Sequence, residues 1–210
     1  MINFQKRILT SFIILPLSIL FIIKSGYFLS FFLIFIFFIG LYELFKSFRE
    51  IKNILFLASI LILSLFSIYY LRVASKDSLT LLYFVIALSI SSDIGGYVFG
   101  KIFKWKKLTK ISPKKTISGV FGSYFFSIIC LVFFNEIYPS GIIIGINIFI
   151  LTIIFSTTTQ VGDLIISYFK RLEKIKDTGK ILPGHGGIFD RIDGLMFVLI
   201  LATILYHFKI

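Results

Sequence analysis

The stretch that decides the fold is residues 54–71, which reads ILFLASILILSLFSIYYL and carries no charged side chain. A helix needs about 20 apolar residues to cross the hydrocarbon core of a bilayer. The length and composition of this segment therefore predict a transmembrane helix. Six further stretches are similar to it in length and low charge: residues 8–23, 27–44, 79–100, 117–134, 141–158 and 195–208.

The overall composition agrees with this interpretation. Hydrophobic residues make up 58% of the 210-residue chain, which contains 27 Phe and has a mean hydropathy of +0.99. Such values lie far outside the range of an ordinary soluble domain. We therefore predict an all-α, polytopic integral membrane protein with about seven transmembrane helices, in the range of about six to eight.

We expect a single membrane domain over residues 1–210, with structural spans in residues 1–91 and the polar motifs in residues 92–210. In the first part, Glu43 stands near a span end, and we interpret it as a paired interfacial residue rather than a catalytic one. The single cysteine, Cys130, falls inside a predicted span, so a disulfide framework is excluded.

The net charge of +12 is unevenly distributed along the chain. With the amino terminus placed in the cytoplasm, 18 of the 22 Lys and Arg residues fall in cytoplasmic segments, as the positive-inside bias predicts. This distribution favours membrane orientation over nucleic-acid binding, so we expect no nucleic-acid partner. We predict a multi-pass protein of the inner or plasma membrane whose polar motifs face the cytoplasm.

The first polar motif is residues 93–100, at the cytoplasmic end of a predicted span. Helical periodicity puts Asp93, Gly96, Tyr97 and Gly100 on one face, where the small residues allow a ligand or another helix to approach the carboxylate. A carboxylate at a span end is costly and usually has a partner. An interfacial Asp93 paired with a loop lysine is the alternative interpretation.

The second motif, residues 111–116, ends a loop with seven lysines and precedes a predicted span. We predict Ser112 as the helix cap, with Pro113 in the first turn. Free amide groups there, beside Lys115 and the Thr116 hydroxyl, would bind a triphosphate or a lipid phosphate. A basic patch that contacts anionic headgroups is an equally supported alternative.

The third motif, residues 160–171, has helical periodicity. Gln160, Asp163, Ser167 and Lys170 form one polar stripe. The stripe offers a carboxylate for a metal ion, a hydroxyl and a cation for phosphate. A solvated helix face is the alternative.

The fourth motif is residues 183–193. Its glycines, including Gly186 and Gly187, permit a loop that folds over a phosphate chain. Asp190 and Asp193 can point together at one cation, with Arg191 available for phosphate, although one of the two carboxylates can instead cap the final helix. His185 lacks His or Cys companions, which favours loop hydrogen bonding or phosphate contact over metal ligation.

Together these motifs resemble the signature of the phosphatidate cytidylyltransferases, also called CDP-diacylglycerol synthases. The resemblance is carried by residues 167–171, 176–179 and 182–193, and residues 93–100, 112–116 and 160–164 resemble that family's other motifs in the same order. Two features depart from the family. Ser118–Gly119 stands where members usually have Glu–Gly, and the chain is shorter than most members.

The resemblance implies an enzyme that joins CTP to phosphatidic acid, giving CDP-diacylglycerol and pyrophosphate, with Mg²⁺ as cofactor. It implies metal binding by Asp163, Asp190 and Asp193, and a catalytic role for these three together with Lys170. Substrate contacts are then expected at the remaining motif positions: Asp93, Ser112, Lys115, Thr116, Ser167, Arg171, Lys176, Asp177, His185, Gly186, Gly187 and Arg191.

Two other functions are alternatives to a cytidylyltransferase. A CTP- or ATP-dependent lipid kinase would attack the γ-phosphorus and would need a base near a substrate hydroxyl. An anion or lipid transporter would favour charges near mid-span and inverted repeats, whereas here the charges cluster at span ends. The resemblance leaves open whether a second, monovalent cation assists Mg²⁺ and whether the protein forms a homodimer.

Overall fold

The computed structural model describes residues 16–109, 111–138, 145–179, 181 and 186–208. Over these ranges the fold is all-α, which confirms the predicted class. After a short helical stretch at residues 16–24, six long helices follow: α2 (Gly26–Ser47), α3 (Ile51–Val73), α4 (Lys76–Phe103), α5 (Ile117–Ile137), α6 (Ile148–Leu172) and α7 (Phe189–Phe208).

All six helices are long and apolar enough to cross a membrane, so the chain is a multi-pass membrane protein. They overlap six of the seven predicted spans. Of the remaining one, residues 8–23, the first half (8–15) lies outside the described residues and the second half (16–23) is helical.

One predicted boundary was wrong. The sixth span was expected to end at Thr158, before the polar stripe, but α6 continues without a break to Leu172. The hydroxyls of Thr157 and Thr158 bond to carbonyls one turn earlier, at 2.8 Å each, so these polar residues are accommodated inside the helix. The last helix begins at Phe189, a few residues before the apolar stretch that starts at Leu195, so Asp190 and Asp193 lie in its first turns, as predicted.

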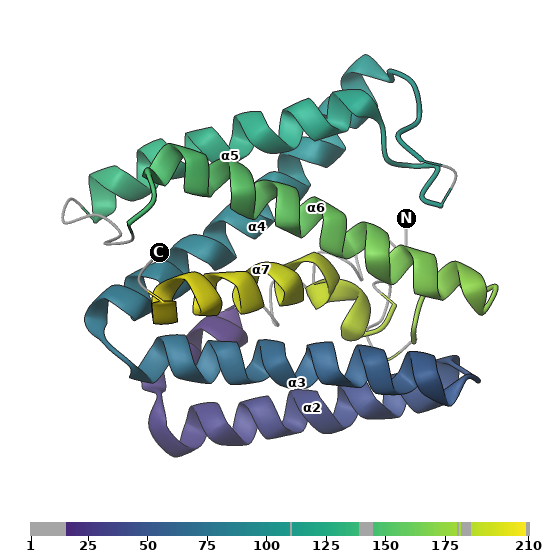
Figure 1. The fold of residues 1–210 in the computed structure, drawn as a ribbon, viewed down its shortest axis with the longest axis horizontal. Coiled ribbons are helices and arrows are strands. Elements are labelled where there is room, and N and C mark those ends of the chain that lie inside the picture. Colours follow the sequence, from purple (N-terminus) through teal and green to yellow (C-terminus); the bar gives the residue numbers. More distant parts are fainter. Residues whose placement is uncertain (1–15, 110, 139–144, 180, 182–185, 209–210) are drawn as a thin grey trace.

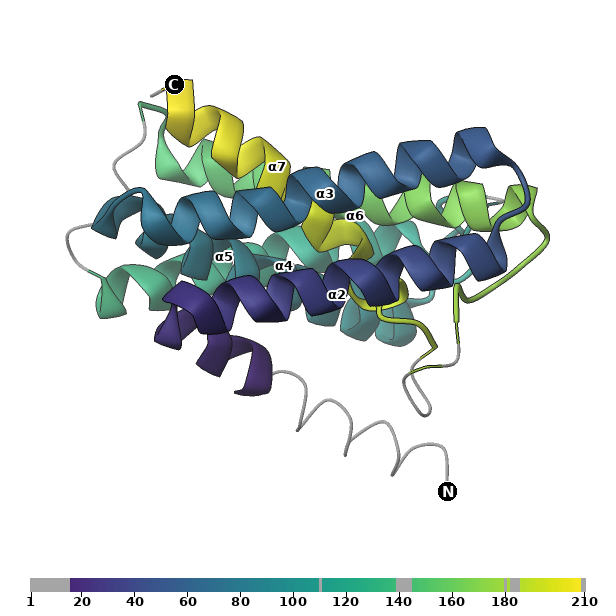
Figure 2. The same ribbon diagram turned by 90° about the horizontal axis from the view of Figure 1, so that it is seen from below.

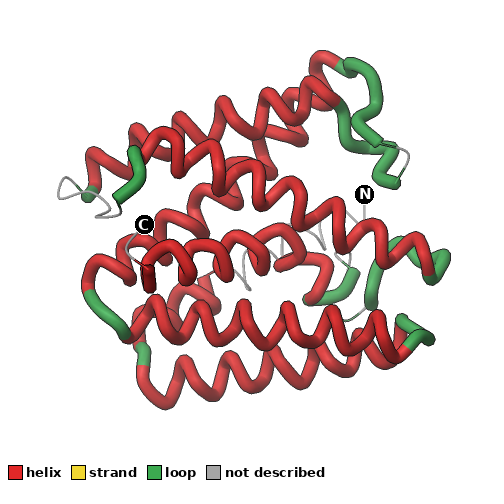
Figure 3. The backbone as a smooth tube through the Cα atoms, in the orientation of Figure 1, coloured by secondary structure: helices red, strands yellow, loops and turns green. Residues whose placement is uncertain are grey.

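The helices form a bundle in which α7 lies between α3 and α6 (Figure 1). The connections gather at its two ends, as the tube in Figure 3 shows. The α2–α3, α4–α5 and α6–α7 connections lie at one end, and the α3–α4 turn and the end of α7 lie at the other (Figures 1 and 2). We call the first the basic end, because it carries the lysine-rich segments that the sequence places on one side of the membrane.

Helices α4 and α5 share the most extensive helix–helix interface among the described residues. Their backbones touch at Gly95 and Gly122: a Cβ atom on Gly95 would lie 2.2 Å from the Gly122 carbonyl oxygen. Small residues allow this close approach, which is typical of helix packing in membranes. On the α4 face that carries Asp93, Gly96 and Gly100 lie against the first turns of α5: their Cβ atoms would lie 2.8 Å from Ser123 Oγ and 3.0 Å from Thr116 Oγ1.

Buried hydroxyl groups connect α4 to its other neighbours. Ser92 and Ser156 of α6 are hydrogen-bonded at 3.0 Å, and the Ser123 hydroxyl on α5 donates to the Ser92 carbonyl at 2.8 Å. Such bonds between membrane helices are worth about 0.6 kcal/mol on average. They hold α4, α5 and α6 in register just below the basic end.

Candidate active site

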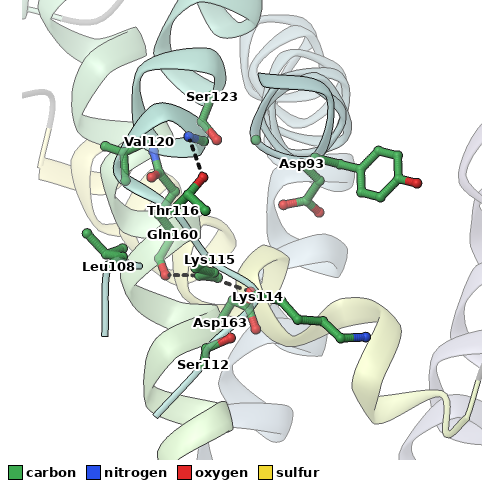
Figure 4. Close-up of a pocket in the computed structure, with 13 residues that line it drawn as sticks. Asp93, Leu108, Ser112, Lys114, Lys115, Thr116, Val120, Ser123, Gln160 and Asp163 are labelled. Atoms are coloured by element: carbon green, nitrogen blue, oxygen red, sulfur yellow. Dashed lines mark hydrogen bonds and ion pairs between the residues drawn. The ribbon is translucent and has the colours of Figure 1, made fainter. Parts of the chain in front are cut away.

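A cavity of about 250 Å³ opens at the basic end between α4, α5 and α6 (Figure 4). It joins the first three sequence motifs, which are separated by up to 70 residues along the chain. Its lining consists of Asp93, Gly96, Tyr97, Leu108, Ser112, Lys114, Lys115, Thr116, Gly119, Val120, Ser123, Gln160 and Asp163. The structure therefore brings together five predicted site residues: Asp93, Ser112, Lys115, Thr116 and Asp163.

The predicted cap of α5 was wrong by four residues. Thr116, not Ser112, is the cap, and its hydroxyl accepts the Gly119 amide at 3.1 Å. Ser112 instead closes a turn, in which its carbonyl accepts the Lys115 amide at 3.0 Å. The reason is a short antiparallel pairing: the Leu108 amide donates to the Lys115 carbonyl at 2.8 Å, which keeps this segment extended up to the cap.

Lys115 and Asp163 form the ion pair at the centre of the cavity. The Lys115 ammonium lies 2.7 Å from Asp163 Oδ2 and donates to the Gln160 carbonyl at 3.1 Å. The Ser167 hydroxyl donates to Asp163 Oδ1 at 3.3 Å. Both charged side chains stay partly open, at 24% and 31% exposure. An anionic ligand that enters the cavity can therefore reach Lys115, and a cation can reach Asp163.

Asp93 enters the same cavity from α4, as Figure 4 shows. The alternative in which it pairs with a loop lysine is not seen among the described residues, where the ion pairs within 4.0 Å involve other carboxylates. Asp93, Asp163 and Asp193 are close enough to repel one another electrostatically. The cavity lining therefore holds two carboxylates, Asp93 and Asp163, and two lysines, Lys114 and Lys115, so it offers oxygen ligands for a cation as well as positive charge for an anion.

A second ion pair lies deeper. The Lys170 ammonium is 3.0 Å from Asp190 Oδ1 and 3.7 Å from Asp193 Oδ2. The Lys170 and Asp190 side chains are only 8% and 4% exposed. Asp190 Oδ2 accepts two further bonds, from the amides of Thr178 at 2.8 Å and Gly187 at 3.0 Å. Asp190 thus anchors the loop before α7 as well as pairing with Lys170.

Sequence reasoning missed the role of Glu43. Its side chain is buried, at 1% exposure, and accepts the amides of Ile188 and Phe189 at 3.0 Å each. It therefore satisfies amide groups at the start of α7 from a different helix, and this part of the α7 N-terminus is not free to bind phosphate. The signal in the sequence was a lone carboxylate within an apolar span, which is costly unless it has a partner.

The remaining predicted residues lie around these two pairs. Arg171 is exposed and donates to the carbonyls of Ile111 at 3.3 Å and Ile175 at 2.6 Å, so it ties the second motif to the end of α6. Gly186 has a φ of +88°, a conformation that favours glycine, as the loop prediction required. Lys176, Asp177 and Arg191 are exposed at the basic end, and His185 lies outside the described residues.

The carboxylates of the site can be compared with the ligands that Mg²⁺ requires. The described residues contain no group of three or more His, Cys, Asp or Glu side chains gathered as a complete metal site. Mg²⁺, however, is commonly held by one or two carboxylates together with substrate phosphates. Asp163 and Asp193 fit that requirement, since each is partly accessible and the two are near each other. Asp190 fits less well, because its side chain is only 4% exposed and both of its oxygens have partners. The metal roles of all three carboxylates stay predictions.

Ser118 occupies the position where a Glu was expected. Its side chain is buried, and its hydroxyl lies 3.0 Å from that of Thr116. At this position the residue supports the α5 cap and adds no charge to the cavity.

Fold and site together define a multi-pass helical membrane protein with a charged, partly open cavity at one end. The chain belongs to the cytidylyltransferase family, whose model matches residues 47–209. That match runs from the end of α2 to the end of α7 and so includes all four motifs.

Curated relatives are named phosphatidate cytidylyltransferase. The Staphylococcus epidermidis protein is 40% identical over 140 residues, covering 65% of this chain and 52% of the relative. The Staphylococcus haemolyticus protein is 41% identical over 143 residues, with the same coverage. The Staphylococcus aureus protein is 46% identical over 121 residues, covering 54% of this chain and 44% of the relative. The chain thus spans about half the length of these relatives.

Proposed function

We propose that this protein is a phosphatidate cytidylyltransferase that converts CTP and phosphatidic acid to CDP-diacylglycerol and pyrophosphate. The observation that carries the proposal is the accessible Lys115–Asp163 pair in a cavity that three separate motifs of the family build together. Family membership and the names of the relatives support it. We further propose that the protein resides in the plasma membrane, with the basic end facing the cytoplasm.

In this reaction an oxygen of the lipid phosphate attacks the α-phosphorus of CTP. A new P–O bond forms there, the bond between the α-phosphorus and the bridging oxygen breaks, and pyrophosphate leaves with the electron pair. The phosphate oxygen is already a competent nucleophile, so no strong base is needed. The barrier lies in bringing two polyanions together and in stabilising the charge on the leaving group.

The residues of the cavity suit this task. Lys115 would exchange its contact with Asp163 for a substrate phosphate, and the neighbouring Arg171 and Arg191 would add positive charge at the rim. Mg²⁺, bound through Asp163 and Asp193, would supply the remaining charge neutralisation. Lys170 would hold Asp190 and Asp193 in place.

The position of the cavity also suits the two substrates. Its lining includes the segment before α5 and the first turns of that helix, at the basic end of the bundle, so a water-soluble nucleotide and a lipid headgroup can both reach it. The lipid can then react without leaving the bilayer.

A labelling experiment with purified protein in phosphatidic acid vesicles tests the proposal. With CTP labelled at the α-phosphorus, the lipid product should carry the label only when phosphatidic acid and Mg²⁺ are both present. Label transferred from the γ-phosphorus would indicate a lipid kinase, and uptake of unchanged CTP would indicate a transporter. Two open questions can be tested with the same preparation. Assays with and without K⁺ test whether a monovalent cation assists Mg²⁺, and light scattering tests whether the protein forms a homodimer.

A further inference from the structure

Glu43 lies on α2, far from the fourth motif in the sequence, and its side chain contacts that motif. Each of its carboxylate oxygens accepts one amide of the two residues at the α7 start, Ile188 and Phe189. One turn further along α2, the Ser47 hydroxyl donates to the Thr178 carbonyl. One face of α2 therefore holds the segment between Thr178 and Phe189 at two points, about 10 residues apart in the chain.

Two glycines of that segment are fitted against the Glu43 carboxylate. A Cβ atom on Gly179 would lie 2.7 Å from Oε1, and one on Gly187 would lie 2.5 Å from Oε2. Either substitution would displace the carboxylate, because a Cβ essentially never comes this near to another heavy atom. The displaced carboxylate would then lose its hydrogen bonds to the α7 amides.

The same segment carries the groups that surround the buried ion pair. Asp190 follows Phe189 directly, and its Oδ2 accepts the amides of Thr178 and Gly187. Two carboxylates thus bind backbone amides at the start of α7 and just before it: Glu43 from α2, and Asp190 from α7 itself. If the Glu43 contacts are lost, one of the two sets of bonds that fix Asp190 against Lys170 is lost with them.

We propose that Glu43 is a positioning residue of the active site: it fixes the start of α7 and thereby holds Asp190 and Asp193 against Lys170. Its effect on turnover rests on the proposed cytidylyltransferase function. Its effect on the order of residues 178–190 does not.

The main test compares two matched variants. Glu43→Gln keeps the size of the side chain but places an amide donor against a backbone amide donor, so one of the two hydrogen bonds cannot form. Glu50→Gln makes the same chemical change at an exposed carboxylate just beyond the end of α2. Both variants are measured for kcat per folded molecule and for amide exchange over residues 178–190.

For Glu43→Gln we expect kcat to fall by about 10- to 100-fold, the usual cost of losing a group that orients catalytic residues. Exchange over residues 178–190 should become faster, while exchange in α3 stays as in the wild type. Glu50→Gln should change neither. An unchanged kcat per folded molecule, or uniformly faster exchange in all helices, would show a merely structural role and overturn the proposal.

A second test uses the contact with Gly179, whose nearest neighbours at the Cβ position are all Glu43 atoms. Gly179→Ala should speed exchange over residues 178–190 in the wild type, but should add little in a Glu43→Ala background, where the obstructing carboxylate is absent. Additive effects would contradict the proposal. This readout needs no turnover, so a wild type that lacks cytidylyltransferase activity would refute the proposed function and leave this test decisive for Glu43.

Discussion

The two Lys–Asp pairs of the molecule are built from the same residue types but have opposite surroundings. Lys115–Asp163 lies in an open cavity, and its two side chains are 24% and 31% exposed. Lys170–Asp190 is 8% and 4% exposed, and two backbone amides also bind Asp190. The first pair can exchange partners with a ligand, whereas the second is integrated into the fold. Losing each pair should therefore have a different consequence.

The largest effect on stability is expected from Asp190→Asn. Removing one partner of a buried ion pair costs about 3–5 kcal/mol, because the other charge stays buried without compensation. The amide that replaces the carboxylate would turn its NH2 group either toward the Lys170 ammonium or toward the backbone amides of Thr178 and Gly187, so one of these two sets of contacts is lost together with the negative charge. Denaturant titration of the purified protein in detergent measures this loss. Wild-type stability would show that the buried pair is not part of the structural framework.

Asp163→Asn should have the converse effect. We expect turnover to fall by about 100- to 1,000-fold, equivalent to about 2.7–4 kcal/mol of lost transition-state stabilisation. Stability should hardly change, because the Asp163 side chain is partly solvated. Steady-state kinetics and the same titration measure both quantities. A variant with normal turnover would remove Asp163 from the proposed metal site.

Lys115→Ala should cause a smaller loss, with kcat/KM reduced by about 10- to 100-fold if Lys115 contacts a substrate phosphate. Lys107→Ala is the matched control, since Lys107 is exposed on the same loop and does not line the cavity. A patch that acts by total charge would give equal losses at both positions, and raising the anionic lipid content would restore activity. That result would favour the lipid-patch alternative.

The smallest effect concerns orientation, which is measured by labelling and not by turnover. Single cysteines in place of Lys107 and Lys176, in a Cys130→Ser background, should react with an impermeant thiol reagent only from the cytoplasmic side. A cysteine in place of Asp77, at the other end of the bundle, should react only from outside. Labelling in the reverse pattern would place the Lys115–Asp163 pair outside the cytoplasm, where it could not meet cytoplasmic CTP.

The sequence predicted what depends on local composition. Spans follow from apolar length, and the residues of the first three motifs follow from their chemistry, so Asp93, Lys115 and Asp163 were predicted before the cavity that joins them was seen. Contacts between distant segments leave no such local signal. Glu43 lies 145 residues from Ile188, and no period or spacing connects them.

Local rules also failed where tertiary contacts compete with them. Ser112 followed by Pro113 is a good start signal for a helix, but pairing of the segment with Leu108 keeps it extended until Thr116. Likewise, the polar residues after Thr158 suggested the end of a span. The helix continues because hydroxyl groups bond within it and contact neighbouring helices.

The backbone contact between Gly95 and Gly122 has a consequence for how substrates enter the cavity. Two helices whose main chains already touch cannot move closer, and separating them would lose their most extensive packing. We expect α4 and α5 to move as one rigid body. Substrate entry would then involve motion of α6 and of the segment between α4 and α5. Distances between spin labels, measured with and without substrate, should stay constant between α4 and α5 and should change between α5 and α6. The cavity wall on α4, which carries Asp93, would then stay fixed during ligand entry, and the wall on α6, which carries Asp163, would move.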